Sequence, residues 1–132
     1  MSKFFIEKTD SSKVKKFWQN SPHNSAFTNP EILSLLHDSV HWWKASKGDV
    51  PMCFWPTCID NKLNMVLPNF FYYFGPFWTE EYLKIKPNSW LALSTKIYEG
   101  FIENFLKNYK SIHSQLPLGL DDIRIFDWWN FN

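Results

Sequence analysis

Glycine and long apolar runs are scarce in this sequence. The four glycines lie at positions 48, 75, 100 and 119, too far apart for a dinucleotide fingerprint or a phosphate-binding loop. The longest apolar run, 70–78, contains a glycine and a proline and is shorter than the roughly 18 residues of a membrane span. The first residues carry too few apolar side chains for a signal peptide. We therefore expect a cytoplasmic protein without a membrane span.

Arginine is also scarce, since Arg124 is the only one. The 14 basic residues are nearly matched by 13 acidic residues, which leaves a formal net charge of +1. Proteins that bind nucleic acid usually carry a clear basic excess and several arginines. We therefore expect no nucleic-acid partner.

Aromatic side chains are abundant instead. They make up 20% of 132 residues, the length of a single domain. This is more ring surface than a core of that size can bury, so we expect most rings in the core and the remainder against a ligand or partner. Within the aromatic segments 42–44, 54–56 and 70–78, we assign Trp43, Trp55 and Tyr72 as platform residues for such a ligand.

The N-terminal part of the chain favours two helices. Ser11 or Ser12 can cap the first helix, which the turn at 20–22 ends. Asn29 can cap the second helix, with Pro30 in its first turn.

The middle of the chain favours strands. Segments 41–45, 52–55 and 63–67, joined by turns at 47–49 and 60–61, are typical of an antiparallel meander. Further short elements are expected as strands at 70–74 and 112–116 and as a helical turn at 120–126.

A long amphipathic helix is predicted over 89–110. Its apolar residues recur every three or four positions, at Trp90, Leu93, Ile97, Phe101 and Phe105. An apolar face of this length must pack on another element, and the sheet is the candidate. The expected fold class is therefore α/β (α+β), with a mostly antiparallel twisted sheet flanked by helices.

The two cysteines and two nearby histidines are residue types found in zinc sites and in nucleophilic catalytic pairs. His37, His41, Cys53 and Cys58 could form a zinc site, but residues five apart in a strand point to opposite faces. A nucleophilic pair of Cys58 with His41 lacks a sequence feature that would stabilise a thiolate. We expect two free, buried thiols and no metal.

Arg124 lies among acidic residues near the C-terminus. Its guanidinium would suit a phosphate or a carboxylate. Asp121 and Asp127, each three residues away, could pair with it instead.

Several short motifs together suggest a family. They are Ser21-Pro22 to Asn29-Pro30-Glu31, Trp42-Trp43-Lys44-Ala45 with Lys47-Gly48, Phe74-Gly75-Pro76, and Asp122-Ile123-Arg124 with Phe126-Asp127-Trp128-Trp129-Asn130. Over essentially the whole chain, they resemble the N-terminal half of tandem-domain, FemAB-like and GNAT-related acyltransferases, which include enzymes that acylate nucleotide-linked amino sugars. The resemblance implies one GNAT-like domain over 1–132 and a second half that binds acyl-coenzyme A.

The resemblance implies the acceptor-side half of an N-acyltransferase, which moves an acyl group from a thioester to an amine such as that of a nucleotide-linked amino sugar. His41 and Asp127 are the candidate bases. Arg124, Trp128 and Asn130 join the platform residues as candidate substrate-binding residues. We expect this chain alone to be inactive, with the C-terminal half or another copy of the chain as its partner.

A non-catalytic module is the alternative. Its aromatic face would hold a carbohydrate or a protein. A reading frame that continues beyond Asn132 would favour the enzyme, and one that ends there would favour the module.

Arg124 generates a direct prediction. If it grips the phosphates of a nucleotide sugar, the ligand should change the tryptophan fluorescence, and Arg124→Lys should weaken binding by on the order of tenfold through loss of one charge-assisted hydrogen bond. A fluorescence titration measures the affinity of both forms. An unchanged affinity would instead favour an Arg124 that pairs with its acidic neighbours.

Overall fold

The computed structural model describes residues 4–36, 39–66 and 75–112, except for the side chains of Phe27 and Leu36. The strands are β1 (Phe4–Thr9), β2 (Val40–Lys47), β3 (Val50–Ile59), β4 (Met65–Val66) and β5 (Phe77–Trp78). The α-helices are α1 (Ser11–Asn20), α2 (Pro30–Leu36) and α3 (Pro87–Asn108), and short 3-10 helices are η1 (Ala26–Thr28) and η2 (Glu80–Lys84). No helix in these ranges has the length and apolar character needed to cross a bilayer.

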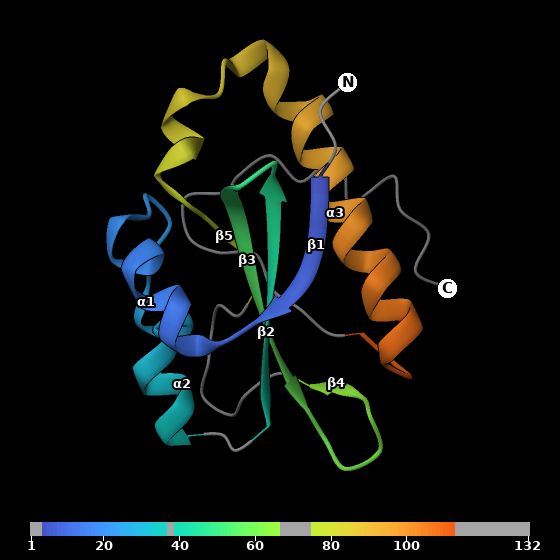
Figure 1. The fold of residues 1–132 in the computed structure, drawn as a ribbon. Coiled ribbons are helices and arrows are strands. Elements are labelled where there is room, and N and C mark those ends of the chain that lie inside the picture. The colour runs from blue at the N-terminus through green and yellow to red at the C-terminus, as the bar shows by residue number, and fades with distance from the viewer. Residues whose placement is uncertain (1–3, 37–38, 67–74, 113–132) are drawn as a thin grey trace.

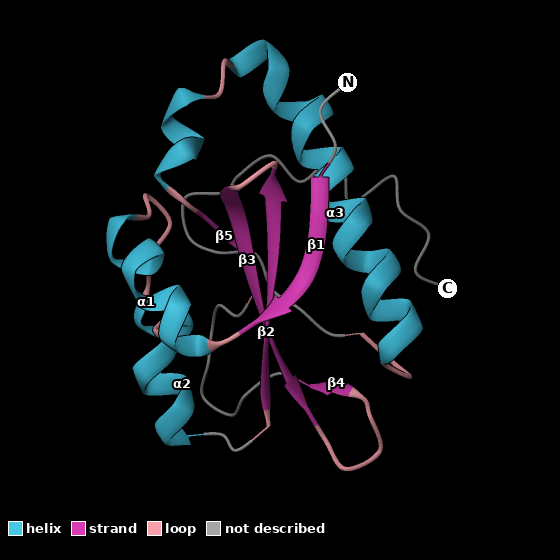
Figure 2. Cartoon of the chain, in the orientation of Figure 1, coloured by secondary structure: helices cyan, strands magenta, loops and turns pink. Residues whose placement is uncertain are grey.

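One antiparallel sheet lies between two helical layers (Figures 1 and 2). The strand order is β1-β2-β3-β4, and β5 also pairs with β3. The core on one face contains Trp43, Trp55 and the buried side of α3. The core on the other face contains Trp42, Phe54 and residues of α1 and α2. The mixed α/β class and the antiparallel meander are confirmed, and β2 and β3 are strands with both faces covered.

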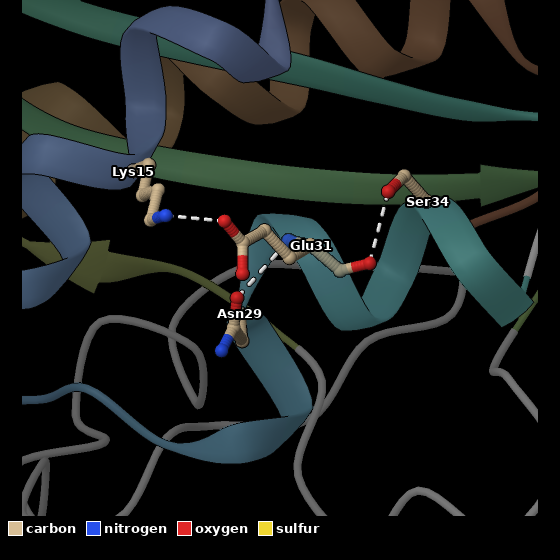
Figure 3. A network of polar contacts seen from close by, with 4 residues as sticks. All are labelled: Lys15, Asn29, Glu31 and Ser34. Carbon is tan, nitrogen blue, oxygen red and sulfur yellow. Dashed lines mark hydrogen bonds and ion pairs between the residues drawn. The ribbon is translucent and has the colours of Figure 1, made fainter.

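Polar contacts fix the two N-terminal helices. The Asn29 side chain accepts a hydrogen bond from the Glu31 N–H at 3.0 Å, so the predicted cap of α2 is confirmed. The Glu31 carboxylate then pairs with Lys15 of α1, joining the two helices (Figure 3). The predicted cap of α1 is wrong, because Ser11 begins the helix and Asp10 holds the capping position without a side-chain cap bond.

The central strand β3 contains Pro56, which has no N–H to donate. The Ile59 N–H donates to Ser39 O, so it points toward β2. Because the backbone N–H groups of successive strand residues point to alternate edges, the backbone nitrogen of Pro56, three positions earlier, faces the edge of β3 away from β2. On that edge β5 pairs at Cys53 and Phe54, and β4 pairs at Cys58 and Ile59. Pro56 lies between these two short pairings and interrupts neither of them. The strand therefore continues beyond the predicted end at Trp55.

The predicted stripe of α3 packs on the sheet. Ile97, Phe101 and Phe105 are fully buried, while Trp90 and Leu93 are partly buried against the same core. The helix also passes close to the edge strand, because a Cβ on Gly100 would lie 3.0 Å from Ile6 Cγ1. The predicted helix and its buried face are confirmed.

Some predicted elements lie outside the described residues: the strand at 70–74, residues 113–116 of the last strand and the helical turn at 120–126. In contrast, β1, β5 and η2 are present although the sequence pattern does not predict them.

Phe101 provides a test of the core. Replacing it with alanine should lower the free energy of unfolding by about 3–5 kcal/mol, because a fully buried ring leaves a cavity. Leu106→Ala, at an exposed position of the same helix, should change it by about 0.5 kcal/mol or less. Urea denaturation measures both, and equal losses would contradict the packing of α3.

Candidate functional site

His41 lies near the start of β2, just beyond the end of β1. The last β1 pair joins Thr9 to Trp42, so no strand among the described residues pairs with His41 on that side. On its other side it is directly opposite Thr57 of β3. His41 is partly buried, whereas the core residues around it are closed to solvent. It is therefore a titratable side chain at an open corner of the sheet.

The hydroxyl of Tyr109 joins this corner to α3. It lies 3.0 Å from His41 Nδ1, 3.0 Å from Thr57 Oγ1 and 2.8 Å from Trp43 Nε1. The Thr57 hydroxyl also lies 3.2 Å from the backbone carbonyl oxygen of His41. Three polar contacts thus connect one buried tyrosine to two adjacent strands, and the fourth joins the two strands to each other.

The number of hydrogens assigns the tautomer of His41. Trp43 Nε1 can only donate, so the Tyr109 oxygen accepts from it. If His41 Nδ1 carries a proton, it also donates to this oxygen, Tyr109 donates to Thr57, and Thr57 donates to the His41 carbonyl. All four contacts are then hydrogen bonds. With the proton on Nε2 instead, only the hydrogens of Trp43, Tyr109 and Thr57 would be available, so one of the four contacts would have no hydrogen. Of the two neutral tautomers, the network therefore favours the one with its proton on Nδ1, in which Nε2 carries the lone pair that can accept a proton.

The end of α3 holds Tyr109 in place. Its N–H donates to Phe105 O at 2.7 Å, which closes the last turn of the helix. The next residue, Lys110, donates its N–H to Leu63 O, and Met65 donates to Ser111 O. The chain after α3 is thus bonded to the segment from the β3–β4 turn to β4. This anchoring places the Tyr109 hydroxyl within hydrogen-bond distance of the His41 and Thr57 side chains.

Both titratable groups of the network have pKa values shifted in the direction that favours their neutral forms. Burial lowers the pKa of His41 below its usual value of 6.5, and the nearby Lys8 ammonium lowers it further. Burial raises the pKa of Tyr109 above 10.0, against the opposing effect of its hydrogen bonds with Thr57 and Trp43. His41 is therefore a base that is largely unprotonated at neutral pH.

A hollow of about 430 Å³ adjoins His41 at the end of β1. We call it the His41 hollow; its charged lining residues are Lys8, Lys13, Lys44, Glu7 and Asp10. Lys44 pairs with Glu7 at 3.2 Å, and the Lys8 ammonium lies 5.3 Å from the centre of the Trp43 ring. With His41 neutral, three cations face two carboxylates, so the hollow has a small positive excess.

The two cysteines lie on opposite faces of β3, as the strand geometry predicted. Cys53 belongs to the core beneath α3, and Cys58 belongs to the core beneath α1 and α2. Burial raises the pKa of Cys58 to about 12 and that of Cys53 well above 9.0. The His41 ring bonds on the α3 side, so the structure does not pair it with Cys58. Across the described ranges, no three His, Cys, Asp or Glu side chains gather as metal ligands.

The structure places three of the predicted site residues. His41 is at the site, and Trp43 helps to hold it through Tyr109. Trp43 and Trp55 are only 4% and 2% exposed, so both pack as core rings and neither offers a face to a ligand. The remaining candidates lie outside the described residues: Tyr72, Arg124, Asp127, Trp128 and Asn130.

Sequence reasoning missed Tyr109, Thr57 and Lys8 as parts of the site. Tyr109 continues the α3 stripe four residues after Phe105, which buries its ring. A buried tyrosine hydroxyl needs hydrogen-bond partners, and this requirement was the available signal. No comparable signal pointed to Thr57 or Lys8, because their roles depend on strand register.

Comparisons with protein-family models, with curated proteins and with solved structures find no match for this chain. A function for the chain therefore rests on its local geometry and on the sequence motifs.

Lys8 provides a test of the electrostatics at His41. Lys8→Gln should raise the pKa of His41, because removal of the positive charge makes the imidazolium less unfavourable. Lys62→Gln, in the exposed β3–β4 turn, should leave it unchanged. Titration of the imidazole resonances by NMR measures both values, and an unaltered value in Lys8→Gln would rule out the proposed coupling.

Proposed function

We propose that this chain is the acceptor-side half of a GNAT-like N-acyltransferase, with His41 as its general base. The observation that carries the proposal is the hydrogen-bond network that leaves Nε2 of a neutral His41 as a proton acceptor. A base oriented through its other nitrogen by a buried group is a recurrent catalytic arrangement. The motif resemblance supplies the reaction class, and acyl-coenzyme A is assigned mainly to a second half.

The proposed reaction transfers an acyl group from sulfur to nitrogen. The lone pair of a neutral amine attacks the thioester carbonyl carbon, and a C–N bond forms. The C–S bond then breaks, the thiolate leaves, and the proton from nitrogen passes to His41 Nε2. Protonation there keeps the Nδ1 hydrogen bond to Tyr109 intact. The Lys8 ammonium beside His41 would also disfavour the protonated form of a nearby amine.

The charges of the His41 hollow support an acceptor that carries phosphate. Lys44 is already paired with Glu7, which leaves Lys8 and Lys13 facing Asp10. Two ammonium groups suit the phosphates of a nucleotide-linked amino sugar. Binding through an exposed aromatic face is less well supported, because Trp42, Trp43, Trp55 and Trp78 are all 4% exposed or less.

Activity of the natural polypeptide containing this chain tests the proposal. With acyl-coenzyme A and an amino-sugar nucleotide, His41→Gln should lower kcat by on the order of 10²–10⁴-fold, because the amine loses its proton acceptor. Lys62→Gln is the matched control and should retain full activity. Undiminished kcat in His41→Gln, with the fold preserved, would contradict the proposal.

The pH dependence gives a second readout of the same base. kcat/KM should rise as pH increases through the lowered pKa of His41, because only neutral imidazole can accept the proton. Lys8→Gln should move this midpoint to higher pH, in the direction expected for the His41 resonance. A midpoint that stays fixed while the resonance moves would assign the activity to another group.

A further inference from the structure

A second hollow lies at the opposite end of β2 from His41. It has a volume of about 560 Å³, within the range of small-molecule sites. We call it the Met52 hollow; it lies between the β2–β3 turn and the segment that runs from η2 into α3. Lys47 lines it and stands six positions after His41 in the same strand, so these two residues are about 20 Å apart. The proposed acyl transfer does not use it.

The floor of the Met52 hollow is apolar. Met52, Ile85 and Leu93 belong to or pack against the core beneath α3, and they reach the surface here. Val50 beside them, the first residue of β3, is 45% exposed and extends this apolar surface. The flexible thioether of Met52 can adapt to an apolar ligand.

The rim of the Met52 hollow is cationic. Lys47, Lys84 and Lys86 stand around it, and Glu81 is the one carboxylate among its described lining residues. Glu81 is 3.1 Å from Lys84, so that charge is already paired. No carboxylate of the described residues forms an ion pair with Lys47 or Lys86. Two ammonium groups with no ion-pair partner among the described residues thus border an apolar floor.

We propose that the Met52 hollow binds a small amphipathic anion, an alkyl chain that ends in a carboxylate or a phosphate. The chain would cover Met52 and Leu93, and the head group would lie between Lys47 and Lys86. The alkyl chain would bury apolar surface against the floor of the hollow, and the anionic head group would accept charge-assisted hydrogen bonds from the lysines of the rim. This arrangement selects against an uncharged hydrocarbon, a compact inorganic anion and a cationic amphiphile.

Titration with monomeric dodecanoate tests the proposal. The methyl resonance of Met52 should shift and saturate, while that of Met65, which is 1% exposed, should stay in place. Dodecyltrimethylammonium has the same tail and the opposite charge, and it should bind at least tenfold more weakly. Inorganic phosphate, which has no tail, should produce no saturable shift. Equal binding of the two amphiphiles would overturn the proposal.

Paired substitutions locate the head group. Lys47→Gln with Lys86→Gln should weaken dodecanoate binding about tenfold or more, while Lys62→Gln with Lys107→Gln, at exposed positions away from the hollow, should not. Thermal unfolding of both double variants checks that they are folded. Unchanged affinity in the first pair would overturn the site. Binding to vesicles of anionic lipid without binding of monomeric dodecanoate would also overturn it, in favour of a membrane-facing surface.

Discussion

The β2–β3 ladder, buried on both faces, is the constraint on which the rest of the structure depends. Trp43 and Trp55 face each other across it on the α3 side, and Phe54 packs on the opposite side with residues of α1 and α2. Removal of these large rings from water is the main favourable contribution to folding. Because each helical layer covers one face of the same two strands, a shift in their register would disturb both cores.

The candidate site depends on this ladder and on one helix end. Register places His41 opposite Thr57, and α3 brings the Tyr109 hydroxyl beneath both. Every polar side chain in this network has a partner, and His41 is the member open to solvent. The same core that gives the domain its stability therefore also sets the orientation and proton position of its candidate base.

Elements with strong local patterns can be predicted from the sequence, and those that depend on distant partners cannot. The α3 stripe and the Asn29 cap are local, and both predictions are confirmed. β1 resembles a short charged segment and becomes a strand through pairing with β2. Pro56 is a residue type that often ends a strand, and its position between the β4 and β5 pairings depends on tertiary structure. Residue type alone points to His41, whereas its orienting partners depend on the assembled sheet.

The position of β1 has a consequence for the order of folding. β2 and β3 are joined by a tight turn at Gly48, but the residues of β1 pair with residues 33 to 43 positions further along the chain. The β2–β3 hairpin can therefore form as a local unit, whereas β1 can pair only after β2 is present. At about 5–20 residues per second, a ribosome completes β2 a few seconds after β1. During that interval Phe4 and Ile6 lack the strand and helix that later cover them, so β1 is exposed to chaperones and to mispairing until β2 is available.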